Sequence, residues 1–517
     1  MGEALVRFYQ QKLKKEWKIA FFSTFIVSLL IHLYKFANTL PNHDSVYNYY
    51  SEQQALGSGR WALSTVSAIS SYFDLPWING LISCIFIALT VVVIVALFRL
   101  KNPVLIGLIG SLLAASPSVT ETFFFNFTAD SYFIAMFLAT LAVYLSRMEE
   151  KRIIFPILGG LCVCVSCGIY QAYVSFTLIL TACYFIDILL QGTQSGKSCL
   201  KWLLRQVLVY VGALAVYYGI WKLSMLVCGV APNDYQGISQ VGNINAHLIV
   251  GGMINAARAV LRYFMQWNVF EYGLTLYSMI NLLFLPVLAL GFVIACIKGG
   301  IYKKKWALVL LVLSCLVVIP FAGMWHFASD DVGYRAMMLT SLVLLFMMCA
   351  ILYERWAKPV LKELVCLLLA VIVFNNAIMA NVSYYYMNVC YERTYAEGIE
   401  IMMEIHDLQD EYEVEKIAVL GNRLGDVQWG FFDEEDGSIT PAGELFMLSS
   451  LIETNLLIDH EHTVLFLRQS FGLEMEGATG EEMSVLSQNP AVQEMGCWPA
   501  EDSMTVIDGI LVLKLSE

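Results

Sequence analysis

The sequence predicts an all-α membrane protein that crosses the bilayer about eleven times and carries a small α/β domain at its C-terminal end. Of its 517 residues, 58% are hydrophobic and only 14% are charged, and the mean hydropathy is +0.65. This composition is too apolar for an ordinary soluble domain. Lys and Arg gather in every second gap between the apolar stretches, as expected of loops that alternate between two sides of a membrane. After residue 381 the composition changes and acidic residues dominate.

Eleven apolar stretches are long enough, or nearly so, to cross the bilayer, because a spanning helix needs about 20 apolar residues to cover a core of ~30 Å. They are residues 19–37, 78–98, 103–119, 129–146, 153–169, 171–190, 207–229, 273–297, 306–323, 335–353 and 364–381. The first follows a basic segment, as in a signal peptide. Since it is long and no small-residue cleavage site follows it, we interpret it as an uncleaved anchor.

The basic residues predict the orientation of the chain. Lys and Arg concentrate in one alternating set of gaps, which comprises residues 7–18, 99–101, 147–152, 197–205, 298–305 and 355–362. Positively charged loops stay in the cytoplasm during insertion. We therefore expect a cytoplasmic N-terminus and an extracytoplasmic C-terminus.

These patterns divide the chain into a transmembrane domain at residues 1–381 and an extracytoplasmic α/β domain at residues 382–517. The second part holds 27 acidic and 5 basic residues, a net charge of −22, which excludes nucleic acid as a partner. We expect it to open with a helix that extends the last span to about residue 410. Apolar runs at 416–420, 463–467 and 504–515 predict strands, with a hairpin turn at Asp508-Gly509, and 442–457 predicts a helix.

Two long loops on the outer side predict helices that lie in the membrane interface. The loop at 38–77 is neither very polar nor apolar enough to span, and its large apolar residues recur near helical spacing. The stretch 245–268 has the same character, with Arg258 and Arg262 one turn apart. Both segments would lie along the bilayer surface.

Polar residues gather at the outer ends of the spans, where their loops can share one site. Charged groups near a bilayer are costly and usually functional. A carboxylate there can take the proton of a sugar hydroxyl, and an arginine can hold a phosphate through two hydrogen bonds. The candidate base is Asp44, the candidate phosphate ligands are Arg60 and Arg335, and further candidates are His43, Asp130, Tyr170, Gln171, Asp330 and Asp331. The adjacent pair Asp330 and Asp331 could instead hold a divalent cation, Mg²⁺ or Mn²⁺.

Each of these residues also has a purely structural interpretation. Asp44 could cap a turn or a helix, and Asp130 could be the N-cap of the fourth span. Arg60 and Arg335 could be interfacial anchors that pair with lipid phosphates. Asp187, near the cytoplasmic end of its span, could simply reach toward water.

Four short motifs resemble the glucosyltransferase II family, bacterial membrane proteins similar to the phage-encoded O-antigen glucosyl transferases. They are Asp44, Gly59-Arg-Trp61, Phe125-Asn-Phe-Thr-Ala-Asp130-Ser-Tyr-Phe133 and Gly168-Ile-Tyr-Gln-Ala172, and the resemblance covers about residues 20–380. It implies a C-type glycosyltransferase fold in the bacterial cytoplasmic membrane, with an outward-facing active site. It further implies a polyprenyl-phosphate sugar, usually glucose, as donor, with Asp44 as catalytic base and Arg60 and Asp130 in the active site. The acidic tail has no counterpart in this resemblance.

We therefore expect a membrane glycosyltransferase that moves a sugar from a polyprenyl-phosphate donor to a surface glycan or cell-wall polymer. The alternative is a lipid-linked sugar flippase or transporter without transfer chemistry. Transporters tend to show internal repeats and charges at the bilayer midplane, and this sequence shows neither clearly. A third interpretation is a structural or sensory protein that acts through its tail.

Overall fold

A computed structural model describes residues 13–48, 55–233, 246–265, 276–327, 335–423 and 455–517. These residues form two compact units. The first comprises residues 13–37 and 55–381. The second comprises residues 38–48, 382–423 and 455–517, so it includes a segment that the sequence analysis grouped with the transmembrane domain.

The first unit is helical. Its longer helices are α2 (Lys15–Ala37), α5 (Pro76–Phe98), α6 (Pro103–Ala114), α8 (Asn126–Leu145), α9 (Ile154–Ile169), α10 (Tyr173–Gln191), α11 (Gly196–Cys228), α12 (Ala246–Met265), α14 (Leu276–Lys298), α15 (Lys305–Leu316), α17 (Val343–Trp356) and the start of α18 (Pro359–Glu411). Short helical turns connect them: α4 (Leu63–Ser67), η1 (Ala68–Ser70), α7 (Pro117–Thr122), η2 (Phe123–Phe125), η4 (Ile301–Lys303), α16 (Val318–Ala322), η5 (Met324–Phe327) and η6 (Ala336–Leu342).

Within the described residues, ten helical segments are long and apolar enough to cross a membrane, which confirms the prediction of a polytopic helical membrane protein. Two predicted spans, 103–119 and 153–169, correspond to the shorter apolar helices α6 and α9. Conversely, residues 248–265 of α12 meet the length and hydropathy of a span, although the sequence analysis expected an interfacial helix there. The described residues of the loop at 38–77, which are 38–48 and 55–77, carry short helices, among them α4 and η1.

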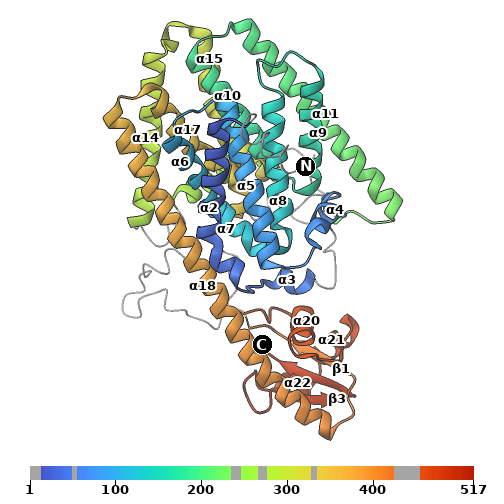
Figure 1. Cartoon of the computed structure of the whole chain (residues 1–517). Helices are drawn as coiled ribbons and strands as arrows, with labels where there is room; N and C mark the ends of the chain where they lie inside the picture. Colours follow the sequence, from blue (N-terminus) through green and yellow to red (C-terminus); the bar gives the residue numbers. More distant parts are fainter. Residues whose placement is uncertain (1–12, 49–54, 234–245, 266–275, 328–334, 424–454) are drawn as a thin grey trace, which may run out of the picture. The chain divides into compact units, whose positions relative to one another are not determined.

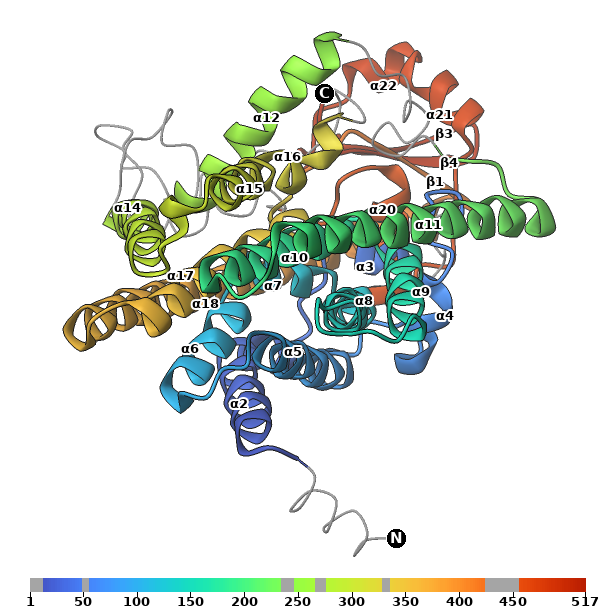
Figure 2. The same cartoon turned by 90° about the horizontal axis from the view of Figure 1, so that it is seen from above.

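Helices α6, α2, α5, α8, α9 and α11 pack in that order, each against the next (Figures 1 and 2). Glycines allow the closest approaches, as is common between membrane helices. A Cβ atom on Gly110 of α6 would collide with Thr24 of α2, and one on Gly80 of α5 would collide with the Phe36 ring. Helix α10 packs against α8, α15, α16, α17 and η6, so it joins this row to the remaining helices.

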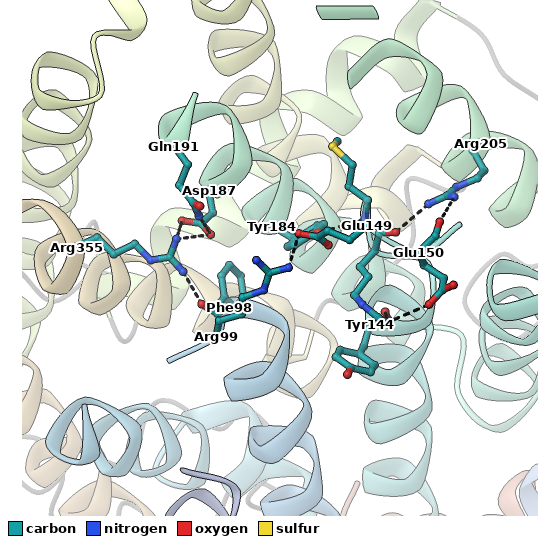
Figure 3. Close-up of polar contacts among 12 residues, drawn as sticks. Phe98, Arg99, Tyr144, Glu149, Glu150, Tyr184, Asp187, Gln191, Arg205 and Arg355 are labelled. Carbon is teal, nitrogen blue, oxygen red and sulfur yellow. Dashed lines mark hydrogen bonds and ion pairs between the residues drawn. The ribbon is translucent and has the colours of Figure 1, made fainter. Parts of the chain in front are cut away.

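A polar network ties together the helix ends that carry the basic residues (Figure 3). Arg355 of α17 donates to both carboxylate oxygens of Asp187 at 2.7 and 2.8 Å and to the backbone carbonyl of Phe98. Asp187 is only 3% exposed. The expectation that Asp187 reaches toward water is therefore wrong, because its partner is an arginine 168 positions later. This pair joins α10, α17 and the end of α5.

The second unit contains a four-stranded sheet in the order β2-β1-β4-β3. Strand β1 (Lys416–Leu420) is parallel to β2 (Glu476–Gly477) and to β4 (Ile510–Lys514), whereas β3 (Met504–Ile507) is antiparallel to β4. The predicted strand at 416–420 and the hairpin are confirmed. Asp508 and Gly509 both have positive φ, of 51° and 78°, as a tight two-residue hairpin turn requires.

The helices of the second unit are α3 (His43–Asn48), residues 382–411 of α18, α20 (His460–Phe471), α21 (Gly480–Ser487) and α22 (Pro490–Glu494). The prediction of a strand at 463–467 is wrong, because these residues lie inside α20. Asp459 accepts a hydrogen bond from His462 N–H as the N-cap, and Gly472 ends the helix in a left-handed conformation. Most of the predicted helix at 442–457 lies outside the described residues.

Val46 of α3 belongs to the hydrophobic core of the second unit. It is 3% exposed and lies in one cluster with Ile417, Leu465, Leu511 and other residues of α18, α20 and the sheet. Helix α3 packs directly against α20. The C-terminal α/β unit is thus completed by a segment from the beginning of the chain.

Replacing Asp187 with Ala should destabilise the first unit by about 3 kcal/mol, because it leaves the partly buried Arg355 guanidinium without its buried counter-charge. Thermal unfolding of the detergent-solubilised protein, followed by size-exclusion chromatography, measures the effect. The matched control is Arg99→Ala, which removes the more exposed Arg99–Glu149 pair and should cost at most about 1 kcal/mol. Equal losses of stability in the two variants would contradict the stabilising role given to the Asp187–Arg355 pair.

Candidate functional site

Three buried polar side chains lie within ten residues of one another along α7, η2 and α8. Glu121 is 3% exposed, and Asn126 and Asp130 are fully buried. Burying polar groups in a membrane-spanning helix bundle is costly unless they have partners or a function. Each of the three contacts a different part of the first unit, so this segment connects the residues discussed below.

Glu121 fixes the segment that contains Arg335. Its carboxylate accepts hydrogen bonds from the backbone N–H groups of Met337 and Ala336, the first residues of η6. Arg335 precedes η6, interacts electrostatically with Glu121 and places its guanidinium carbon 5.4 Å from the centre of the Phe125 ring. Arg335 is therefore held beside a buried carboxylate and an aromatic face.

Asn126 connects α8 to the loop before α5. Its side-chain amide donates to Asp74 Oδ1 at 2.6 Å, and its backbone carbonyl accepts from the Asn79 amide at 2.9 Å. Asp74 also interacts electrostatically with Lys35, a fully buried lysine near the end of α2. The bundle therefore contains a lysine, an aspartate and two amides in one buried group, and we call Lys35, Asp74, Asn79 and Asn126 the amide cluster.

Asp130 lies one helical turn after Asn126, on the same side of α8. Its carboxylate oxygen Oδ1 accepts from the Ser131 backbone N–H at 2.8 Å. The N-cap position of α8 belongs to Phe125, so the interpretation of Asp130 as a helix cap is wrong. Within the part of the chain that the structure describes, Asp130 Oδ2 has no hydrogen-bond partner, nor do Asp74 Oδ2, Asn79 Oδ1 and Asn126 Oδ1.

The motif that contains Arg60 docks on the motif that contains Tyr170 and Gln171. Gln171 donates to the Ser58 carbonyl at 2.7 Å, and the Arg60 guanidinium carbon lies 5.6 Å from the centre of the Tyr170 ring. Tyr170 in turn stacks on Tyr132 of α8 with 4.4 Å between ring centres. Arg60 is thereby connected through two aromatic rings to the helix that carries Asp130.

Two glycines make this docking possible. Gly59 has φ = +86°, and a Cβ atom there would lie 2.6 Å from both Gln171 Nε2 and the Tyr217 hydroxyl. A Cβ atom on Gly168 would lie 2.4 Å from the Trp61 ring. Both positions therefore require glycine, one for its conformation and both for close approach.

His43 and Asp44 belong to the second unit, on α3. Asn42 caps this helix, because its side chain accepts from the Ser45 N–H at 2.8 Å. Asn42, and not Asp44, is therefore the N-cap of α3. Its side chain is 30% exposed and lies 3.4 Å from His43 Nε2.

The structure thus brings Arg60 together with Tyr170 and Gln171, and His43 together with Asp44. Arg60 and Arg335 lie over different aromatic rings, Tyr170 and Phe125. Asp330 and Asp331 lie outside the described residues. Within the described ranges, no group of three or more His, Cys, Asp or Glu residues is arranged to hold a metal ion.

Sequence reasoning missed the amide cluster. Lys35 lies inside the first apolar stretch, and a lysine within a span is itself a signal of function. Asn126 lies in the quoted motif four residues before Asp130, which is the spacing that puts two residues on one helix face. Asp74 and Asn79 gave no comparable signal, because an Asp before a span and an Asn within its first turn are common.

A scan against protein-family models matches residues 33–345 to the family described as glucosyl transferase GtrII. The match covers more than half of the chain and includes all four quoted motifs, so it confirms the resemblance. No curated protein and no solved structure matches the chain. Glu121, Asp130 and the amide cluster lie within the matched region, and the acidic C-terminal segment lies outside it. The chain belongs to the GtrII glucosyl transferase family.

Proposed function

We propose that this glucosyl transferase takes its glucose from a polyprenyl-phosphate donor and passes it to a glycan or cell-wall polymer on the outer face of the bacterial cytoplasmic membrane. Family membership supports sugar transfer. The proposal of a lipid-linked donor rests on the charged and polar side chains inside a bundle of membrane-spanning helices. Such a bundle suits a substrate whose hydrocarbon tail stays in the bilayer while its phosphate needs cationic partners.

The transfer exchanges one bond to the anomeric carbon of glucose for another. The acceptor hydroxyl oxygen bonds to that carbon, the bond from the carbon to the phosphate oxygen breaks, and polyprenyl phosphate leaves with the electron pair. The hydroxyl proton passes to a base. The reaction therefore needs one carboxylate near the acceptor and positive charge near the leaving phosphate.

We assign the base to Asp44. Its carboxylate is partly exposed and lies 3.4 Å from the His43 ring. A base must reach its substrate, so a partly exposed carboxylate suits this role better than the fully buried Asp130 does. Asp130 has a supporting role in this proposal, since it lies on α8 one turn from the amide cluster.

We assign Arg60 and Arg335 as the residues that bind the phosphate of the donor. A guanidinium offers a planar fork of donors that fits two phosphate oxygens, and stacking on an aromatic ring reduces the freedom it must lose on binding. Tyr170 orients Arg60, and Phe125 and Glu121 orient Arg335. Gln171 contributes by fixing the backbone of the Arg60 loop.

Replacing Asp44 with Asn should lower kcat by about 10²- to 10⁴-fold, because the amide cannot accept the acceptor's proton. The assay follows radiolabelled glucose from polyprenyl-phosphate glucose into the polymer fraction of membranes that contain the full chain. Asp407→Asn, an exposed change on α18, is the control and should retain full activity. Full activity of the Asp44 variant, at equal protein level, would remove Asp44 from the mechanism.

Replacing Arg60 with Ala should raise the KM for the lipid donor by about 10- to 100-fold, the usual loss for a hydrogen bond to a charged group. Varying the donor concentration in the same membranes measures it. Arg262→Ala, which removes an exposed arginine of α12, should leave this KM unchanged. A change of similar size in both variants would indicate a general effect of membrane charge instead of a phosphate site.

A further inference from the structure

The second unit brings four ionisable side chains together from two distant parts of the sequence. His43 and Asp44 come from α3, and Asp459 and His462 come from the first turn of α20. The His43 and His462 rings meet edge to face with 5.6 Å between their centres. The His462 ring also packs against Tyr47 at 5.5 Å. Two imidazoles therefore lie between two carboxylates.

Asp459 holds His462 in a fixed orientation. Both of its carboxylate oxygens lie 2.9 Å from His462 Nδ1, and one of them also accepts from the His462 backbone N–H at 2.8 Å. Burial of Asp459 opposes its ionisation, but the hydrogen bonds from His462 outweigh it and lower the pKa of Asp459. Asp459 is therefore a carboxylate at neutral pH, and it accepts a hydrogen bond from the N–H group at His462 Nδ1.

The neighbouring His460 is oriented differently. Its Nδ1 accepts from the Val419 backbone N–H, and its Nε2 donates to the Ala478 carbonyl, so it faces the sheet. Burial lowers its pKa. The other ionisable group in this turn is Glu461, and Tyr391 of α18 packs on the same core as Tyr47. The His462 ring contacts α3 through His43 and Tyr47.

We propose that Asp459 and His462 are positioning residues for the base Asp44, acting through the His43 ring. The inference rests on the proposed role of Asp44 and adds residues that lie outside the region matched to the GtrII family. The His462 ring limits the positions of the His43 ring, and His43 Nε2 lies 3.4 Å from Asp44 Oδ1. Val46, buried in the same core, anchors the helix that carries both. The C-terminal unit thereby sets the position of the base.

The test compares kcat and KM in full-length variants, with membranes and radiolabelled polyprenyl-phosphate glucose as above. His462→Ala should lower kcat by about 10- to 100-fold, the usual cost of a misplaced catalytic group, with little change in the donor KM. Asp459→Ala should behave similarly. Asp459→Asn should retain most of kcat, since an Asn side chain still accepts hydrogen bonds at the N-cap.

Two controls separate positioning from simple destabilisation of the unit. Leu457→Ala removes a fully buried core side chain, so it should reduce the amount of folded protein but leave kcat per folded molecule unchanged. His406→Ala removes an exposed histidine of α18 and should change neither quantity. Folded protein is counted by size-exclusion chromatography of the detergent extract.

Failure of the positioning role and failure of the proposed role of Asp44 give different results in these assays. If Asp44→Asn is inactive while His462→Ala and Asp459→Ala keep full kcat, the positioning role is overturned and the base survives. If Asp44→Asn is fully active, both proposals fail. Should His462→Ala not fold, the comparison of Asp459→Ala with Asp459→Asn decides, and equal kcat values in those two variants would overturn the inference.

Discussion

A polar side chain buried among membrane-spanning helices cannot obtain hydrogen bonds from lipid, so its partners must come from the protein or from a bound molecule. This constraint organises the first unit around α7, η2 and α8. Glu121 obtains a partner from the start of η6, Asn126 from the loop before α5, and Asp130 from the Ser131 backbone. Segments far apart in the sequence are thus held against one short stretch by polar contacts as well as by apolar packing.

The two polar regions of the first unit satisfy this constraint to different degrees. At the basic helix ends, Arg355 is matched to Asp187 and the Phe98 carbonyl (Figure 3). Arg205 donates to three backbone carbonyls, those of Ser146, Arg147 and Glu150. In the amide cluster and at Asp130, four oxygen atoms have no partner among the described residues. The polar contacts at the basic helix ends therefore stabilise the packing of the helices. The second region keeps acceptors that water or the hydroxyl groups of a sugar can satisfy.

The sequence predicted the helical membrane class, most of the spans and the Asp508-Gly509 hairpin, because each depends on local composition or on a short turn signal. It did not predict the Asp187–Arg355 pair or the contact between Asp74 and Asn126, since periodicity contains no information about partners 168 or 52 positions away. The apolar run at 463–467 suits a buried strand and a buried helix equally well. The Asp459 cap decided in favour of the helix. Arg60, Tyr170 and Gln171 were selected from short motifs, and their mutual contact required the fold.

The interleaved construction of the second unit has a consequence for how the protein is made. Helix α3 is synthesised early, whereas β1, α20 and β4, which contribute to the core that contains Val46, come from the last fifth of the chain. At ribosomal speeds of about 5–20 residues per second, the delay is on the order of half a minute. During that interval the nascent chain exposes an apolar side chain with no core to enter. A chaperone that shelters this segment would therefore matter most before translation ends, and a truncated product would keep α3 permanently unsheltered.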